Sequence, residues 1–223
     1  MYTINAMPEQ VPAEDLDLLS GVETATVGHW RLMGFMNRAI QPLLPGRRVV
    51  GTAVTLAIAG PDSTLLHHAA GLLRPGDILV IDRLGDDKYA CWGGGVTVAV
   101  KASGATAGIV DGPCTDLTEI IDSDFPMWSR GLSPITTRIY DLGGGMNIPV
   151  SCGGAVVMPG DAILADESGV LVVPRNEVRA VAEKALGMQE RGKQREASVR
   201  DRVEKLGDLS GASAKVLAKL GPA

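Results

Sequence analysis

The stretch A-G-I-V-D-G-P-C-T-D-L-T-E, residues 107–119, predicts the fold class of the whole chain. Its first four residues are apolar, which is typical of a strand buried on both faces of a sheet. Asp111-Gly112-Pro113 should end that strand, because glycine and proline interrupt strand pairing and turn the backbone. The next residues form the first turn of a predicted helix, with Thr115 or Asp116 as its cap. A buried strand that leads into a helix favours an α/β fold.

Three carboxylates, Asp111, Asp116 and Glu119, lie at or just after the end of this strand. In open α/β sheets that end faces the crevice in which ligands bind. Asp116 and Glu119 are three residues apart, so a helix places them on one face. Their hard oxygen atoms suit a cation such as Mg²⁺. The alternative is that they only cap the helix and complement its dipole, and the spacing alone favours that simpler interpretation.

Composition and charge argue against several classes of function. The chain has 223 residues, enough for one large domain or two small ones, and its net charge is −5. That charge argues against binding to nucleic-acid phosphates. No stretch approaches the roughly 18 apolar residues of a membrane span, and residues 1–15 lack the apolar core of a signal peptide. We therefore expect neither a nucleic-acid partner nor a membrane partner.

The cysteines and histidines offer no metal site in the sequence. Cys91, Cys114 and Cys152 lack metal-type spacing, and we interpret them as reduced thiols of a cytoplasmic protein. A reactive role for Cys114 is disfavoured, because the carboxylates near it raise the pKa of a thiol. His67 and His68 are adjacent, so a helix would point them in different directions and they would not share a zinc ion.

The triple glycine in Trp92-Gly93-Gly94-Gly95 marks a second candidate site. It directly precedes a predicted helix over residues 96–103. The free N–H groups at such a helix start can bind a carboxylate or a phosphate. The turn lacks both the Gly-Lys-Ser/Thr ending of a P-loop and the G-x-G-x-x-G dinucleotide pattern. A tight turn without any ligand explains the glycines equally well.

Strand and helix patterns alternate along the rest of the chain. We expect a single domain over residues 1–223, with a core at about 20–175 and a C-terminal helical extension at about 175–220. Gly187 and Gly192 should bend or break the long helical segment. The expected strands cover 48–58, 77–81, 107–110, 125–129, 135–140, 149–150, 155–157, 162–165 and 170–173, with 143–145 as a loop; the expected helices cover 14–41 in two pieces, 64–73, 96–103, the segment from 175 onward and 212–220.

Seven segments of the chain match one known family in order and spacing. They are residues 46–53, 74–82, 92–95, 108–112, 159–161, 165–170 and 172–174. Together they resemble the RraA-like family, which contains regulators of RNase E activity and metal-dependent 4-hydroxy-4-methyl-2-oxoglutarate aldolases. The resemblance extends from about residue 20 to residue 206. It implies a swivelling β/α/β domain with N-terminal and C-terminal helices, assembled as a homotrimer or a dimer of trimers with active sites between subunits.

The resemblance also implies a metal ligand. Catalytic members of the family carry an Arg-Asp pair at a fixed distance after the glycine-rich turn, and their Asp holds a divalent metal, Mg²⁺ or Mn²⁺. In this chain Thr115-Asp116 occupies that place, and Thr115 stands twenty-one positions after Gly94. By this resemblance Asp116 is the metal ligand of the site.

Further site residues follow from the same resemblance. Gly94, Gly95 and Val96 match the segment whose backbone N–H groups receive the carboxylate of a small-molecule substrate. Glu119 matches the acid that follows the metal ligand. Glu196, in the late helix, matches an acid that can reach the site of a neighbouring subunit.

The chain departs from the family at one position, because Thr115 stands where catalytic members have arginine. Threonine cannot make the charged, two-pronged contact that arginine makes with a carboxylate. By analogy with the loss of an oxyanion donor, this change should cost several kcal/mol at the transition state. Arg83 or Lys88, near the end of the preceding strand, could supply the missing charge, whereas Lys101 lies further along its helix.

Three functions remain open from the sequence. The first is a metal-dependent lyase that cleaves a C–C bond of a 2-oxo acid, by retro-aldol cleavage or by oxaloacetate-type decarboxylation, with Glu119 or a neighbour's Glu196 placing the water that moves the proton. The second uses the same site for another reaction or substrate, because Thr115 replaces the arginine. The third is a non-catalytic regulator that binds an RNase or another protein. No sequence signature for S-adenosylmethionine binding supports a methyltransferase.

Overall fold

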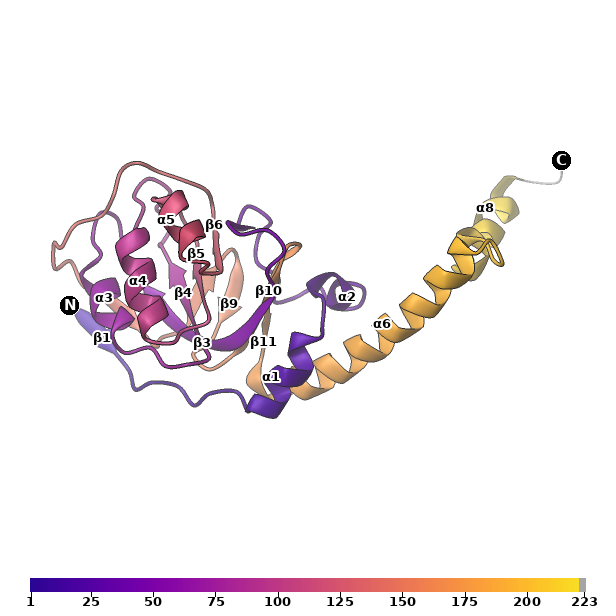
Figure 1. The fold of residues 1–223 in the computed structure, drawn as a ribbon, viewed down its shortest axis with the longest axis horizontal. Helices are drawn as coiled ribbons and strands as arrows, with labels where there is room; N and C mark the ends of the chain where they lie inside the picture. Colours follow the sequence, from indigo (N-terminus) through magenta and orange to yellow (C-terminus); the bar gives the residue numbers. More distant parts are fainter. Residues whose placement is uncertain (221–223) are drawn as a thin grey trace.

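The computed structural model describes residues 1–220, and parallel strands form its centre (Figure 1). β3 (Val49–Ala57), β4 (Asp77–Asp82), β5 (Ala107–Val110) and β6 (Met127–Ser129) lie next to one another in this order and run parallel. Every residue of β4 and β5 is buried, which explains their unbroken apolar sequences. The expected strands at 48–58, 77–81 and 107–110 and the α/β class are confirmed.

The outer strands complete the sheet, in the order β1-β7-β3-β4-β5-β6-β2. The antiparallel hairpin of β10 and β11 joins the first half of β3, while β7 pairs with its last two residues. A separate two-stranded sheet contains β8 and β9. The bounds are β1 (Tyr2–Ile4), β2 (Gln41–Pro42), β7 (Gly144–Met146), β8 (Val150–Cys152), β9 (Ala155–Val157), β10 (Ala162–Asp166) and β11 (Gly169–Val173).

Both faces of the central sheet are covered. Helices α3 (Thr64–Ala70), α4 (Gly94–Ala102) and α5 (Leu117–Asp122) lie on one face, as Figure 1 shows. Alternate residues of β4 divide between the two cores: Leu79 packs with these helices, and Val80 packs on the other face with β8 and β9. A third core forms where the β10–β11 hairpin meets the helices at the two ends of the chain.

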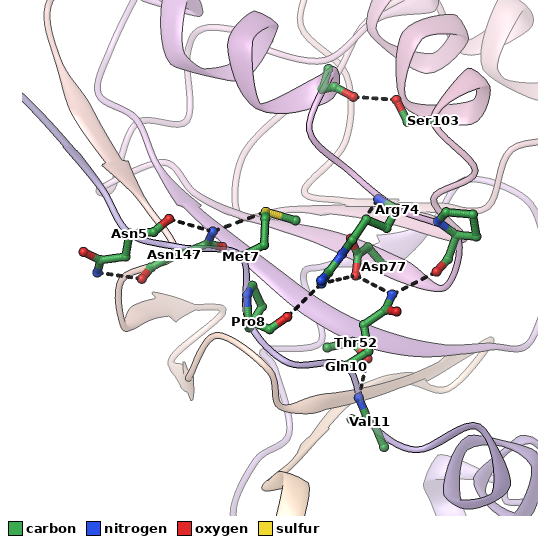
Figure 2. Close-up of polar contacts among 12 residues, drawn as sticks. Asn5, Met7, Pro8, Gln10, Val11, Thr52, Arg74, Asp77, Ser103 and Asn147 are labelled. Atoms are coloured by element: carbon green, nitrogen blue, oxygen red, sulfur yellow. Dashed lines mark hydrogen bonds and ion pairs between the residues drawn. The ribbon is translucent and has the colours of Figure 1, made fainter.

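The first residues of the chain form a strap across the start of the central strands (Figure 2). Asn5 and Asn147 exchange side-chain to backbone hydrogen bonds of 2.9 and 3.3 Å. Further along the strap, the Gln10 amide donates to the buried Asp77 carboxylate at 2.9 Å. Arg74 donates to the same carboxylate and to the carbonyl of Pro8. The strap therefore holds the edge at which β4 begins and leaves the opposite edge, where the strands end, to the candidate site.

The N-terminal helices are shorter than expected. α1 (Ala13–Ser20) and α2 (Thr24–Gly28) form, but the second expected piece does not continue as a helix to residue 41. The reason is a backbone pairing with β11 that the local pattern does not reveal. Phe35 bridges Leu171, and the N–H of Met36 donates to Val170 at 2.9 Å.

Two further expectations near residue 140 are wrong. Residues 143–145 do not form a loop, because Gly144 and Gly145 belong to β7, which pairs with both β1 and β3. Residues 135–140 form no strand; only isolated bridges attach Thr136 to Ala90 and Arg138 to Asp62. In both segments a partner distant in the sequence decides the conformation.

The C-terminal helix α6 (Val178–Arg200) projects from the body of the molecule as an arm (Figure 1). It runs unbroken through Gly187 and Gly192, because strong helix formers flank each glycine and a single glycine costs only about 1 kcal/mol. A 3₁₀ turn (Arg175–Glu177) precedes it, and α7 (Leu206–Leu209) and α8 (Ala212–Leu220) follow. The final helix confirms the expected 212–220. No helix within residues 1–220 has both the length and the apolar content that a membrane crossing requires.

Candidate active site

Three loops meet at the edge of the sheet where β4, β5 and β6 end. Parallel strands end at a common edge, so the connections that follow them lie together. Isolated bridges join Trp92 to Cys114 and Cys114 to Leu132. The N–H of Thr115 donates to the Trp92 carbonyl at 2.9 Å, and the N–H of Ser133 donates to the Cys114 carbonyl at the same distance. The glycine-rich turn and the acidic turn, which are separate in the sequence, therefore form one site.

Trp92 anchors the glycine-rich turn in the core. Its side chain is fully buried, and its ring stacks on Phe125 with centroids 6.0 Å apart. The indole N–H donates to the Thr97 hydroxyl at 2.9 Å, and that hydroxyl donates to the Gly93 carbonyl at 2.9 Å. These bonds fix the start of α4 at Gly94, two residues earlier than the sequence indicated.

The carboxylate of Asp116 is held by the neighbouring helix. Asp116 stands at the N-cap position of α5, as predicted, but its side chain makes no capping bond there. Instead its Oδ2 atom accepts a hydrogen bond of 3.0 Å from the N–H of Gly94 at the start of α4. The backbone of Asp116 is left-handed, with φ of 54°, a conformation that is costly for a residue other than glycine and is concentrated at functional sites.

Two of the glycines are required by close packing against the two acids. A Cβ atom at Gly93 would overlap Oδ2 of Asp116, and one at Gly94 would overlap Oε2 of Glu119. Asp116 and Glu119 thus lie on one face of the α5 start, as their spacing predicted, and both contact the glycine-rich turn. At Gly95 the same position is open space. The turn is therefore shaped around the two carboxylates.

A cavity of about 470 Å³ opens beside these residues. The amide N–H groups of Gly95 and Val96 have no acceptor among residues 1–220, because Gly93 at the N-cap position has no side chain to provide one. Helix α4 contacts both α3 and α5. The residues that line the cavity include members of α3, of α4 and of the start of α5. The lining includes Ser63, His67, Cys91, Gly93, Gly95, Val96, Thr115, Asp116, Thr136, Thr137 and Arg138.

The structure brings some of the predicted site residues together and leaves others apart. Gly95, Val96, Thr115 and Asp116 line the cavity, while Gly94 and Glu119, which contact each other, are not part of its lining. The N–H of Gly94 is engaged with Asp116 and is not free for a substrate in this arrangement.

Arg83 lies outside the cavity lining, although it was a candidate replacement for the missing arginine. Its side chain is completely buried. Its guanidinium donates to the Gly60 carbonyl at 2.5 Å and to the Asp86 carboxylate at 2.9 Å. Lys88 stacks over the Tyr89 ring instead, and the Lys101 ammonium donates to the Ser123 carbonyl. None of these three cations faces Asp116.

Glu196 is also separate from Asp116 within one chain. It lies on the α6 arm and lines a different cavity, of about 620 Å³, together with α2 residues such as Thr26. The arm projects away from α4 and α5 in Figure 1. Glu196 can therefore act at a candidate site only in a neighbouring copy of the chain.

The thiols near the cavity are held in their neutral form. Burial raises the pKa of Cys91, which lines the cavity, to about 11. Burial also raises the pKa of Cys114, with Asp116 as a smaller contribution, so desolvation rather than the nearby charge is the main cause. Neither residue provides a thiolate nucleophile at neutral pH.

The donor set fits a hard, well-hydrated cation. Residues 1–220 contain no group of three or more His, Cys, Asp or Glu side chains placed to hold a metal, so they offer no fully protein-ligated site such as structural zinc requires. Mg²⁺ needs only one or two carboxylates, because it keeps several of its waters. The exposed Asp116 carboxylate is a site of that kind. Glu119 lies next to Gly94 and is the second carboxylate nearby.

Two residues of the cavity, His67 and Arg138, were not predicted as site residues. The sequence suggested His67 only as a zinc ligand, which was discounted, and it placed Arg138 in an expected strand over residues 135–140 that does not form. One signal was available for His67, because a helix start after Asp62 places it one turn into α3. For Arg138 no local signal exists.

Comparison with known proteins gives a consistent result. The family described as Aldolase/RraA (RraA-like) matches residues 24–172. A protein of Halalkalibacterium halodurans named "Putative 4-hydroxy-4-methyl-2-oxoglutarate aldolase" is 33% identical over 168 residues, covering 75% of this chain and 80% of that protein. A protein of Arabidopsis thaliana named "Putative 4-hydroxy-4-methyl-2-oxoglutarate aldolase 3" is 30% identical over 139 residues, covering 60% of this chain and 82% of that protein.

Solved structures show the same fold. Streptomyces coelicolor RraAS2, described as an unusual member of the RNase ES inhibitor RraA protein family, superposes with a TM-score of 0.76 at 25% identity, covering 85% of this chain and 98% of its own. The RNA-processing inhibitor RraA from Thermus thermophilis has a TM-score of 0.58 at 22% identity, covering 75% of this chain and 94% of its own. These neighbours confirm the fold that the sequence resemblance implied.

Proposed function

The chain belongs to the RraA-like family, and we propose that it is a divalent-metal-dependent lyase that cleaves a C–C bond of a 2-oxo acid. Retro-aldol cleavage or oxaloacetate-type decarboxylation is the reaction. The proposal depends on one observation above all: the Asp116 carboxylate lies at the N-terminus of α4, in the wall of a cavity. The names of the curated relatives support a lyase of the aldolase type.

The free N–H groups of Gly95 and Val96 bind the carboxylate of the substrate in this proposal. They stand in the first turn of a nine-residue helix, where the dipole favours a negative charge. Because these groups belong to the backbone of a helix anchored by Trp92, they are oriented before the substrate arrives.

Asp116 would hold Mg²⁺ or Mn²⁺, with Glu119 as the supporting acid. When bound, the cation would supply Lewis-acid stabilisation of the negative charge that develops as the C–C bond breaks. The hydrogen bond from Gly94 orients the Asp116 carboxylate, and Thr115 adds a hydroxyl contact of 3.2 Å to its Oδ1 atom. Glu119 and Glu196 of a neighbouring copy are the proposed proton carriers.

We further propose a homotrimer or a dimer of trimers in the cytoplasm. The α6 arm supports assembly, because only Val178, Val181, Ala182 and Ala185 are buried in its 23 residues. Beyond the arm, Val203, Leu206 and Leu217 are more than half exposed, which leaves apolar surface available to a neighbour. Three buried free cysteines support a reducing compartment.

Turnover of oxaloacetate and of 4-hydroxy-4-methyl-2-oxoglutarate tests the proposal, with pyruvate as the measured product and with Mg²⁺ or Mn²⁺ added or chelated. Asp116→Asn keeps an oxygen that can accept from Gly94 but removes the charge, so it should abolish both metal binding and metal-dependent turnover. Asp122→Asn is the matched control, because Asp122 is exposed at the other end of the same helix. Full turnover by Asp116→Asn would overturn the proposal.

A second candidate function is a non-catalytic regulator that binds a ribonuclease, which the similarity to RraAS2 favours. A third keeps the site but changes the substrate, because Thr115 replaces the family arginine. Metal binding without turnover of either 2-oxo acid would favour the third. A wild-type protein with neither property but with ribonuclease inhibition would favour the second.

A further inference from the structure

Arg138 is fixed at the cavity by hydrogen bonds on both sides of its backbone. Its N–H donates to the Pro61 carbonyl at 2.7 Å, and its carbonyl accepts from Ser63 at 2.9 Å. The buried Asp62 carboxylate accepts from the N–H groups of Tyr140 and Leu142 just beyond it. The segment that carries Arg138 is therefore attached to the start of α3.

Among the described residues, the guanidinium of Arg138 has unused donors and no ion-pair partner. Its Nη1 atom donates to the carbonyl and hydroxyl of Thr136 and to the carbonyl of Thr137. Within residues 1–220, its Nε and Nη2 atoms have no acceptor, and no carboxylate forms an ion pair with it. Apart from Arg38, every other arginine up to Arg179 has such a partner.

Arg138 and Asp116 line the same cavity from different segments of the chain. Asp116 approaches the cavity from the start of α5, whereas Arg138 and His67 approach it from the side of α3. The start of α4, with the free N–H groups of Gly95 and Val96, lies between them. The lining of one cavity thus includes both a helix start and an arginine with free donors, two features that attract negative charge.

We propose that Arg138 binds a second carboxylate of the substrate and so makes the site selective for dicarboxylic 2-oxo acids; this inference rests on the proposed function. The first carboxylate of the substrate binds at the start of α4, and the carbon atoms between its two carboxylates span the cavity. Arg138 acts on binding rather than on bond cleavage, because it lies away from Asp116. Thr115 then leaves space for the middle of the substrate, between its two carboxylates, without adding charge.

The first test compares the KM and kcat for oxaloacetate in the wild type and in Arg138→Gln, Arg138→Lys and Arg38→Ala. Loss of a charged hydrogen bond should raise the KM of Arg138→Gln about 10- to 100-fold with little change in kcat, and Arg138→Lys should recover part of the loss. Arg38→Ala is the matched control, because Arg38 also lacks an ion-pair partner among the described residues but does not line this cavity. An unchanged KM in Arg138→Gln would overturn the inference.

A second measurement separates this inference from the proposed function. Thermal unfolding with malonate or with acetate measures binding of a dicarboxylate and a monocarboxylate without any reaction. Malonate should raise the Tm of the wild type more than acetate does, and Arg138→Gln should remove that difference. If no 2-oxo acid is cleaved but this pattern holds, the proposed lyase fails and the dicarboxylate site remains. If turnover is present but malonate has no advantage, the inference fails and the lyase remains.

Discussion

The Oδ2 atom of Asp116 accepts a hydrogen bond of 3.0 Å from the backbone N–H of Gly94. The first residue of one helix therefore holds the acid that precedes the next helix. Because the two helices follow neighbouring parallel strands, this contact couples the glycine-rich turn to the acidic turn.

Gly94→Ala should disrupt the site, whereas Gly95→Ala should leave the fold intact. The new Cβ at Gly94 would overlap Oε2 of Glu119, while at Gly95 it meets no atom within 4 Å. We expect Gly94→Ala to lower the free energy of unfolding by about 1–3 kcal/mol and to reduce turnover. Urea unfolding and the pyruvate assay measure the two effects. Equal stability of the two variants would contradict this prediction.

Thr115→Arg should increase turnover of 2-oxo acids. Thr115 lines the cavity beside Asp116, so an arginine there would add a charged donor next to the metal-binding acid. We expect kcat for oxaloacetate to rise about tenfold or more, by analogy with restoring an oxyanion donor. Thr136→Arg, on the other side of the cavity, is the control. A lower kcat in a folded, metal-binding Thr115→Arg variant would show that the site serves another reaction.

Protonation of the Asp62 carboxylate should make the protein less stable in acid. Burial alone would raise the pKa of Asp62, but hydrogen bonds from Thr64, Tyr140 and Leu142 lower it from 3.8 to about 2. A lowered pKa in the folded state stabilises the fold above the unfolded pKa, and this contribution is lost as the pH falls from about 4 to about 2. The shift corresponds to about 2 kcal/mol at neutral pH.

Asp62→Asn should remove this contribution and weaken the pH dependence between about 4 and 2. An asparagine also turns one acceptor into a donor that would face the N–H of Leu142 or of Tyr140. Unfolding free energies measured at pH 7 and at pH 3 provide the test. A difference between wild type and variant that is the same at both pH values would refute the assigned role of the carboxylate.

Thr97→Val should destabilise the start of α4. The buried indole N–H of Trp92 would lose its acceptor, and the Gly93 carbonyl would lose a donor. An unsatisfied buried donor costs about 1–3 kcal/mol. Trp92→Phe combined with Thr97→Val should cost less than the two single changes together, because the unpaired N–H is then absent. Additive costs would argue against this pairing.

The three cysteines should be unreactive in the folded protein. All three are buried, and burial raises the pKa of Cys91 and of Cys152 well above the ordinary value. A thiol reagent at pH 8 should therefore modify no cysteine until guanidinium chloride unfolds the chain, and then all three should react. Rapid labelling of the native protein at any one of them would contradict the burial seen in the structure.

The sequence predicted the parts of the site that depend on local pattern. The apolar strand at 107–110 and the spacing of Asp116 and Glu119 were enough to place both acids on one face at the end of a strand. The role of Gly94 was predicted less well, since its N–H bonds Asp116 rather than remaining free.

Parts that depend on distant partners could not be predicted in the same way. Arg138 reaches the cavity only because its backbone pairs with residues near Asp62 and the neighbouring Thr136 bridges Ala90, contacts that span more than forty residues of sequence. The same explanation holds for β7, a glycine-rich strand that exists because β1 and β3 flank it. A local pattern contains no information about such pairings.

The projecting helix α6 has a consequence for hydrodynamic measurements. Its 23 residues extend about 35 Å, its buried residues end at Ala185, and the last hydrogen bonds to the N-terminal helical region are those of Gln189. A compact particle with such a rod has a larger frictional coefficient than a sphere of equal mass, so it elutes early from a gel-filtration column calibrated with globular standards. The mass of the protein in solution should therefore be measured by light scattering or by sedimentation equilibrium, which do not depend on shape.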